Sequence, residues 1–207
     1  MIIGCVITYN DEAMLPGCLE SLRGQVDRLI VVDGAFATYP LVDGNPASTD
    51  ATREVAWCYG VEWISCHTGD DGRPRAWETE MEKRSSYLVG EEGDWYLHLD
   101  TDERLIGELP ELEDGAHYAL AIHVAGRVVW VPRLFQHRGW MRYEGAHNAL
   151  WSDDELIHLR GAVRVNPARC RLAHLAAFRP AWQQLAKQEH YAKRTPAEKA
   201  YREIHGI

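Results

Sequence analysis

The stretch WYLHLDTDER, residues 95–104, is an apolar, strand-like run that ends in two carboxylates one residue apart. Side chains alternate along a strand, so we expect Asp100 and Asp102 to point the same way. Two hard oxygen ligands at a strand end suit a divalent cation such as Mg²⁺ or Mn²⁺. The simpler interpretation is a solvated acidic turn after a buried strand, and the rest of the sequence has to decide between the two.

Other apolar runs in the first half of the chain have the same form. The runs at residues 2–9 and 28–34 are nearly continuous in apolar side chains, which is typical of strands buried on both faces of a parallel sheet. Ser48 is the predicted N-cap of a helix that runs from Ala51 to Tyr59. Together the patterns predict strands at 2–9, 28–34, 61–66 and 95–100, and helices at 15–22, 51–59 and 74–88. Such alternation predicts an α/β domain with right-handed crossovers.

Polar residues follow the predicted strands at the point where each strand ends. Ligands of open α/β sheets bind outside the carboxyl ends of the strands. The residues at these ends are Thr8, Tyr9 and Asn10, then Asp33, then Asp100 and Asp102. We expect them to converge on one edge of the sheet, which favours a metal or ligand site over a solvated turn.

The pattern changes after Pro110. Residues 117–135 alternate and predict antiparallel strands around Gly126, residues 160–175 predict another strand pair, and 180–194 predict a polar helix. The expected fold is therefore α/β, with a mostly parallel central sheet, helices on both faces and a small antiparallel C-terminal part.

Composition limits the classes of protein. The formal net charge of −9 disfavours a general nucleic-acid binder, which usually carries a basic face. The five cysteines are scattered without a C-x-x-C pair, as expected for free thiols in a reducing compartment. The sequence has neither an apolar run long enough to span a membrane nor the charged start of a signal peptide, so a cytoplasmic location is the expectation.

The order of the motifs resembles that of family 2 glycosyltransferases with the GT-A fold. The segments that carry the resemblance are VITYNDE (6–12), VVDG (31–34), STDAT (48–52), GDWYLHLDTDER (93–104), PRLF (132–135), RYEGAH (142–147), His174 and EHYA (189–192). The resemblance covers roughly residues 2 to 194. It implies one glycosyltransferase domain over 1–207, with a nucleotide-sugar half (1–104), an acceptor half (105–194) and a polar tail (195–207).

The resemblance also implies a site. The donor would be a nucleotide-diphosphate sugar, and the residues implied to contact it are Thr8, Tyr9, Asn10, Glu12, Asp33, Arg84 and Asp100. A Mn²⁺ or Mg²⁺ ion would bridge the diphosphate, held by Asp100 and Asp102 of the D-x-D motif, with His174 completing its shell. Such an ion acts as a Lewis acid on the departing diphosphate, while a side chain deprotonates the acceptor hydroxyl.

Two departures from the family pattern stand out. A thirteen-residue loop, 35–47, separates Asp33-Gly34 from Ser48, and such loops are often functional. Many relatives have His-Glu where this chain has His147 followed by asparagine, which cannot accept a proton at neutral pH. His147 or Glu144 is the predicted base of an inverting enzyme; Asp153, or a retaining mechanism that needs no such base, stays open.

The acceptor and the source are open at this level. A saccharide, a protein or a modified DNA base could supply the acceptor hydroxyl. The compact chain with its long loop is reminiscent of bacteriophage enzymes, which act in the host cytoplasm. Two other functions remain: a catalytically degenerate GT-A domain that binds sugar or a partner, and a nucleotidyltransferase. The latter usually has a basic, glycine-rich loop after its first strand, which TYNDE (8–12) does not provide.

Overall fold

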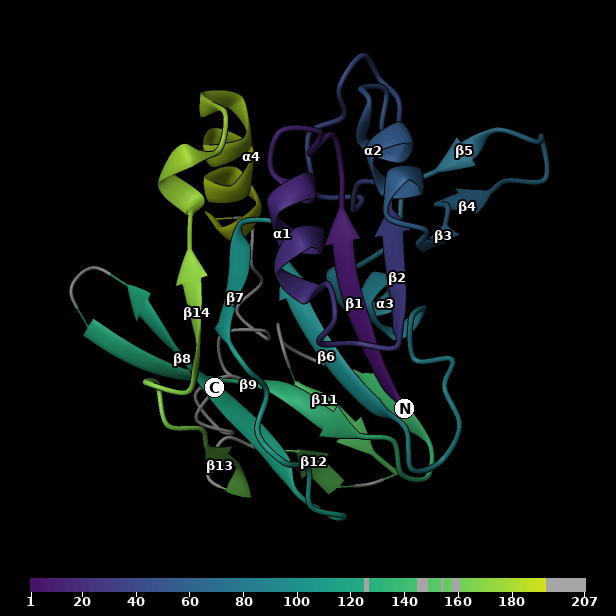
Figure 1. Ribbon diagram of the computed structural model, residues 1–207. Helices are drawn as coiled ribbons and strands as arrows, with labels where there is room; N and C mark the ends of the chain where they lie inside the picture. The colour runs from purple at the N-terminus through teal and green to yellow at the C-terminus, as the bar shows by residue number, and fades with distance from the viewer. Residues whose placement is uncertain (125–126, 145–148, 154, 158–160, 193–207) are drawn as a thin grey trace.

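The computed structural model of the protein describes residues 1–124, 127–144, 149–153, 155–157 and 161–192 (Figure 1). The elements in the first half are β1 (Ile2–Thr8), α1 (Leu15–Leu22), β2 (Arg28–Asp33), α2 (Thr52–Cys58), β3 (Glu62–Ile64), β4 (His67–Thr68), β5 (Pro74–Arg75), α3 (Glu80–Ser85) and β6 (Trp95–Asp100). Those that follow are β7 (Glu103–Gly107), β8 (His117–Val124), β9 (Arg127–Gln136), β10 (Met141–Tyr143), β11 (Leu150–Ser152), β12 (Glu155–Ile157), β13 (Val163–Arg164), β14 (Cys170–His174), the 3-10 helix η2 (Ala176–Phe178) and α4 (Ala181–Ala192).

One large sheet organises the described part of the chain. Its strand order is β3-β2-β1-β6-β9-β8-β14-β7, with β13 paired to β8. The first four strands are parallel, β9 runs antiparallel to both β6 and β8, and β14 runs parallel to β8. A separate antiparallel sheet contains β10, β11 and β12. The expected α/β fold with a mostly parallel central sheet and antiparallel C-terminal strands is confirmed.

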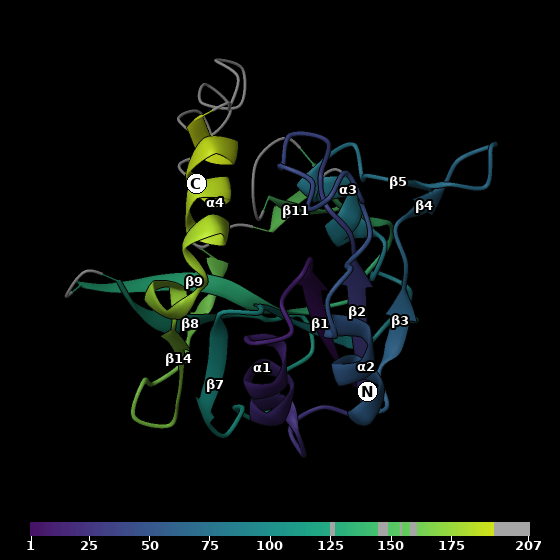
Figure 2. The ribbon, with the colours of Figure 1, turned by 90° about the horizontal axis from the view of Figure 1, so that it is seen from above.

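The carboxyl ends of the parallel strands meet at one edge, as the sequence predicts. Thr8 lies opposite Asp33 in the β1–β2 pair, and Ile7 lies opposite Asp100 in the β1–β6 pair. In Figure 1 the arrowheads of β1 and β2 point to the edge above which lie the loop 35–47 and α4. Figure 2 looks down on this edge and shows α4 beside it.

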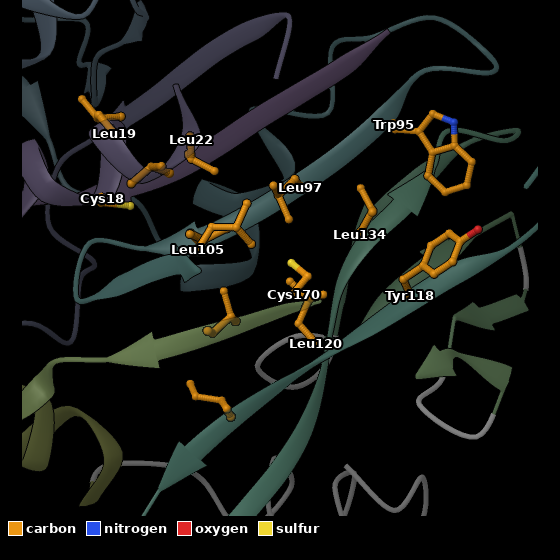
Figure 3. Packing of buried hydrophobic residues seen from close by; sticks show 14 of the residues in the cluster. Cys18, Leu19, Leu22, Trp95, Leu97, Leu105, Tyr118, Leu120, Leu134 and Cys170 are labelled. Atoms are coloured by element: carbon orange, nitrogen blue, oxygen red, sulfur yellow. The ribbon is translucent and has the colours of Figure 1, made fainter. Parts of the chain in front are cut away.

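Alternation along the strands divides the core between the two faces of the sheet. Val6 and Val31 point to the face covered by α1, where Leu19 and Leu22 pack against Leu97 of β6 (Figure 3). Each fully buried leucine of this kind stabilises the fold by about 2 kcal/mol. The opposite face is covered by α3 and the small sheet, and its buried side chains are Ile3, Cys5, Ile30, Val32, Cys66, Trp77, Tyr87, Tyr96, Phe135, Met141, Tyr143 and Leu150. Helices therefore lie on both faces.

The helix predicted over 74–88 is wrong in its first half. Pro74–Arg75 forms β5 and pairs with β4 in a hairpin. The helix α3 begins only after Thr79, whose hydroxyl accepts a hydrogen bond from the Glu82 amide at 3.0 Å and so caps the first turn. Only residues 80–85 of the predicted segment are helical, because the hairpin takes its start and a turn at 86–87 ends the helix before Leu88.

Two smaller expectations also differ. Helix α2 begins at Thr52 with Ala51 at the N-cap position, so Ser48 is not its N-cap; the Ser48 hydroxyl instead accepts the Asn10 amide and donates to the carboxylate of Asp33. The strands β13 and β14 do not pair with each other; both pair with β8. The hairpin expected around Gly126 is present as β8 and β9, although Gly126 itself lies outside the described residues.

All five cysteines lie in the described part of the chain, and each is a free thiol. None of the described helices combines the length and the apolar character needed to cross a membrane.

Candidate functional site

A pocket opens at the carboxyl edge of the parallel strands. Its empty space measures about 610 Å³, a part of which is open solvent at the mouth. Its lining comes from the β1 and β2 ends, the loop 35–47, α3, the end of β6, and the η2–α4 region: Ile7, Thr8, Tyr9, Asp11, Gly34, Ala35, Phe36, Tyr39, Glu80, Lys83, Arg84, Asp100, Arg179 and Lys187. Four of the predicted donor residues, Thr8, Tyr9, Arg84 and Asp100, are thus brought together.

The lining contains three aromatic rings beside four basic side chains. Tyr39 makes edge contacts with both Tyr9 and Phe36, each with ring centroids 6.0 Å apart. The ammonium of Lys83 lies 5.4 Å from the centre of the Phe36 ring. The pocket therefore offers flat apolar faces and positive charge, which are the surfaces that a base and a phosphate need.

Lys83 joins the ends of two strands. Its side chain is buried, and its Nζ donates to the carbonyl oxygens of Thr8, at 2.6 Å, and of Gly34. Burial lowers the pKa of Lys83 to about 8, against the opposing attraction of the carboxylates of Asp33 and Asp11. Any anion that enters the pocket would favour the charged form of this lysine.

Arg84 is buried on α3 and holds Asp100. Its Nε donates to Glu80 at 2.9 Å, and its Nη2 donates to Oδ1 of Asp100 at 2.6 Å. Its Nη1 and the hydroxyl of Thr8 are enclosed and have no hydrogen-bond partner among the described residues. Two donors in the pocket lining are therefore available to a ligand that carries acceptor oxygens.

Asp102 lies in a different environment from Asp100. The strand β6 ends at Asp100, and residues 101–102 turn the chain into β7. Asp102 is completely buried, and its Oδ2 receives the Nε of Arg179 at 2.8 Å, with His174 at 3.4 Å and Lys187 at 3.7 Å. The strand alternation that predicts a common direction therefore does not reach Asp102, which lies two residues beyond the end of β6.

Charge stabilises the ionised form of Asp102. Burial alone would raise its pKa, but the hydrogen bonds from His174 and Arg179 outweigh burial and hold the pKa well below its usual range. In return, the hydrogen bond to Asp102 raises the pKa of His174, while partial burial opposes the rise. The predicted ligands Asp102 and His174 are thus adjacent, and they form an ion pair when His174 is protonated.

Arg179 connects three parts of the site. Besides Asp102, its guanidinium donates to Asp11 at 3.0 Å and to the hydroxyl of Thr101 at 2.8 Å. Asp11 follows β1, Thr101 follows β6, and Arg179 precedes α4. The Arg179 guanidinium is the one cation that contacts both of these buried carboxylates among the described residues, which makes it a structural centre of the site as well as a lining group.

Three of the predicted donor residues hold the backbone instead of lining the pocket. Asp33 accepts hydrogen bonds from the Ser48 amide at 3.0 Å and hydroxyl at 2.5 Å. Asn10 has a φ of 50°, and its side-chain oxygen accepts the Thr49 amide at 2.8 Å. Glu12 is exposed and accepts the amide of Ala51 at 2.8 Å. All three fasten the segment before α2.

Of the two predicted catalytic residues, the structure describes Glu144 alone. His147 lies outside the described residues. Glu144 follows β10 and is exposed, and its carboxylate accepts the Nε of Arg142 at 2.6 Å. Asp153, the remaining candidate base, has a φ of 50° in the turn between β11 and β12, and its carboxylate accepts a hydrogen bond from the amide of Trp140 at 2.9 Å.

The sequence interpretation missed Lys83, Arg179, Lys187 and the aromatic residues of the loop. Lys83 stands next to Arg84 on a predicted helix, which was a usable signal. Arg179 directly precedes Pro180 at the predicted start of the last helix, five residues after His174. Its link to Asp11 joins residues 168 apart, which no local pattern reveals.

No known protein-family profile matches the sequence. A TPR repeat-containing protein of Synechococcus elongatus is 31% identical over 167 residues, which cover 75% of this chain and 36% of that protein. The chain therefore spans about a third of the length of this curated relative.

Several solved structures resemble part of the chain. Glucosyl-3-phosphoglycerate synthase from Mycobacterium tuberculosis, crystallised with Mn²⁺, UDP and glucosyl-3-phosphoglycerate, is 24% identical over 52% of this chain and 35% of its own, with a TM-score of 0.36. TarS of S. aureus is 24% identical over 62% of this chain and 23% of its own, with a TM-score of 0.40. A mycobacterial protein is 22% identical over 59% of this chain and 40% of its own, with a TM-score of 0.38.

Proposed function

We propose that the chain is a glycosyltransferase of the GT-A kind, which moves a sugar from a nucleotide-diphosphate donor to an acceptor hydroxyl. The observation that carries the proposal is the pocket at the strand ends, which combines aromatic rings with Lys83, Arg84, Arg179 and Lys187. This lining suits a ligand with one flat apolar end and one polyanionic end. The order of the family 2 motifs along the sequence supports the same assignment.

The unpartnered donors of the lining support a diphosphate. The Nη1 of Arg84 and the hydroxyl of Thr8 are buried and lack partners among the described residues. A buried donor without a partner costs about 1–3 kcal/mol, which a phosphate oxygen would recover. Guanidinium groups also bind phosphate oxygens in a geometry that a single point charge does not match.

We propose that the acidic residues would hold a divalent ion whose coordination shell the donor diphosphate completes. Oδ1 of Asp102 is buried without a hydrogen-bond partner among the described residues, and His174 lies beside the other oxygen. Across the described ranges, no three His, Cys, Asp or Glu side chains form a complete metal group. Mg²⁺ is commonly held by one or two carboxylates together with substrate phosphates, so Asp100, Asp102 and His174 would hold it in part. The ion would stabilise the charge of the departing diphosphate.

The cationic side chains would supply charge at the same place. Arg84 and Lys83 on α3, and Arg179 and Lys187 at the other wall, would bind and orient the diphosphate as negative charge develops on it. Burial keeps Lys83 and Arg84 in place before the donor arrives. Little reorganisation is then needed at the moment of bond cleavage.

The acceptor side completes the proposal. An inverting mechanism needs a base that removes the acceptor proton, and we propose Glu144 or His147 for this role. The acceptor hydroxyl would belong to a saccharide, a protein or a modified DNA base. Glu144 is exposed, and its carboxylate accepts a hydrogen bond from Arg142.

One observation favours a second candidate, a catalytically degenerate domain that only binds a nucleotide sugar. Asp102 is fully enclosed and already paired with Arg179, His174 and Lys187. A domain that had lost catalysis could keep these pairs for stability alone. Binding would then persist without turnover.

Donor hydrolysis in the presence of Mn²⁺ distinguishes the two. We expect release of nucleoside diphosphate from at least one UDP-, GDP- or dTDP-sugar, and loss of release in Arg84→Met with the fold retained. Glu62→Gln, which alters an exposed ion pair with Arg28 away from the pocket, is the matched control and should keep its activity. Tight binding of a donor without turnover across a panel of acceptors would support the degenerate domain.

A further inference from the structure

We propose that the inserted segment 35–47 forms the wall of the pocket that contacts the nucleobase, with Phe36 and Tyr39 as its contact residues. The inference rests on the proposed nucleotide donor. It assigns base recognition to residues of the insertion instead of Asp33, to which the family resemblance points.

The insertion is closed at its base. The amide of Ala35 donates to the carbonyl of Pro46 at 2.8 Å. The carboxylate of Asp33 accepts both the amide and the hydroxyl of Ser48. The chain thus leaves the end of β2 and returns to the same point thirteen residues later. Asp33 and Ser48 are adjacent in space, as they would be if the segment were absent.

The carboxylate of Asp33 is occupied by this closure. Each of its two oxygens receives a hydrogen bond from Ser48, and its backbone carbonyl receives the indole N–H of Trp77 at 2.7 Å. Asp33 is 3% exposed. A base that approached it would have to displace bonds that hold the insertion in place.

Tyr9, which lines the pocket, anchors the second half of the insertion. Its hydroxyl donates to the carbonyl of Asn45 at 2.6 Å and accepts the amide of Val42 at 2.8 Å. Its ring meets Tyr39 edge-on at an interplanar angle of 86°. The residue that follows β1 therefore holds the insertion in place through two hydrogen bonds to its backbone.

Phe36 and Tyr39 are held on the pocket side of the insertion. Their rings are perpendicular, at 85°, and both residues line the pocket. The amide of Ala37 donates to the carbonyl of Trp77 at 2.7 Å, and the Tyr39 amide donates to Phe36 at 2.9 Å, so the backbone between the rings is fixed. Stacking on such rings is tolerant of base identity and is lost when the ring is removed.

Basic side chains lie next to the aromatic side chains in the pocket. Lys83 lies over the Phe36 ring, and Arg84 is the next residue on α3. A base at Phe36 and Tyr39 would therefore place its phosphates toward the lysine and arginine side of the same pocket. The lining thus separates the two halves of a nucleoside diphosphate.

Isothermal titration calorimetry tests the inference. The probes are UDP, GDP, dTDP, CDP and inorganic pyrophosphate, each with Mn²⁺, and the variants are Tyr39→Ala and Phe36→Leu. Leu41→Ala is the matched control, because Leu41 belongs to the same insertion, is 42% exposed and is absent from the pocket lining. We expect Tyr39→Ala to weaken the tightest nucleotide at least about tenfold, while pyrophosphate binding and the control stay within twofold of wild type.

The outcomes separate the two proposals. Unchanged pyrophosphate binding shows that the variant is folded, so a selective loss of nucleotide affinity supports the base wall. Nucleotide affinity within twofold of wild type in both variants, or an equal loss for pyrophosphate, overturns the base wall alone. If the wild-type protein binds none of the four nucleotides, the proposed function itself is wrong.

Discussion

Asp102 shows how a residue predicted to bind metal also contributes to the fold. Its carboxylate is buried and is shared by Arg179, His174 and Lys187, which come from the last quarter of the chain. A buried carboxylate is tolerated only with such partners. The sequence placed Asp102 and His174 in one site, and they are neighbours. It could not show Arg179, because that contact depends on how η2 turns into α4.

Removal of Arg179 should destabilise the protein strongly. Arg179→Met leaves Asp11 and Asp102 buried with fewer partners, and we expect a loss of about 3 kcal/mol in the free energy of unfolding, measured with urea. Arg171→Met, on the exposed side of β14, is the matched control and should change stability by less than about 0.5 kcal/mol. Equal effects of the two variants would show that the Arg179 cluster is not structural.

The pair of His174 and Asp102 should make stability depend on pH. The raised pKa of His174 means that its charged form stabilises the folded state. This contribution is complete below about pH 6.5, the pKa of an unfolded histidine, and is lost as the pH rises through the higher folded pKa. We expect His174→Gln to destabilise more at pH 5.5 than at pH 8.5, by on the order of 1 kcal/mol or less because His174 is partly exposed.

Urea unfolding of metal-free protein at both pH values measures this difference. The same substitution in an Asp102→Asn background is the control, since the charged partner is then absent and the pH difference should vanish. A destabilisation that is the same at pH 5.5 and pH 8.5 in the wild-type background would contradict the ion pair.

At the scale of elements, the strand ends and the helices α1 and α2 were predictable, whereas the β4–β5 hairpin and the role of the loop 35–47 were not. The continuous apolar runs identified β1, β2 and β6, and the parallel pattern placed their ends at one edge. The β4–β5 hairpin within residues 67–75 was missed because its pairing overrides the helical spacing of 74–88. The role of the loop 35–47 was left open because its anchor, Tyr9, lies 33 residues before Val42.

Gly34 lies between the end of β2 and the insertion 35–47, and it should not tolerate a side chain. Its φ is +114°, and an added Cβ would lie 2.6 Å from Cβ of Cys66. We expect Gly34→Ala to lower the midpoint of thermal unfolding further than Gly44→Ala does. Gly44 also has a positive φ, +72°, but an added Cβ there meets nothing within 4 Å. Both variants bear a strain of about 1–2 kcal/mol, and only Gly34→Ala adds an overlap. Equal unfolding midpoints for the two variants would contradict this prediction, because they would mean that the backbone at Gly34 shifts to accommodate the added Cβ.

At the scale of the molecule, charge is distributed unevenly. The chain carries a formal net charge of −9, yet Lys83, Arg84, Arg179 and Lys187 gather around one pocket. Composition alone could not reveal this, because the four side chains come from α3, from the link between η2 and α4, and from α4 itself. The fold brings these basic side chains from distant parts of the sequence to one pocket. An acidic protein thereby has a local site for an anion.

The central claim is that this pocket binds a nucleoside diphosphate together with a divalent ion. Thermal unfolding with UDP, GDP, dTDP and CDP, each with and without Mn²⁺, tests it most directly. A ligand that binds the folded state at about 100 times its Kd adds about 2.7 kcal/mol, or roughly 5–10 °C for a chain of this size. We expect one nucleotide to produce such a rise, and only when Mn²⁺ is present. No shift with any nucleotide under either condition would contradict the account.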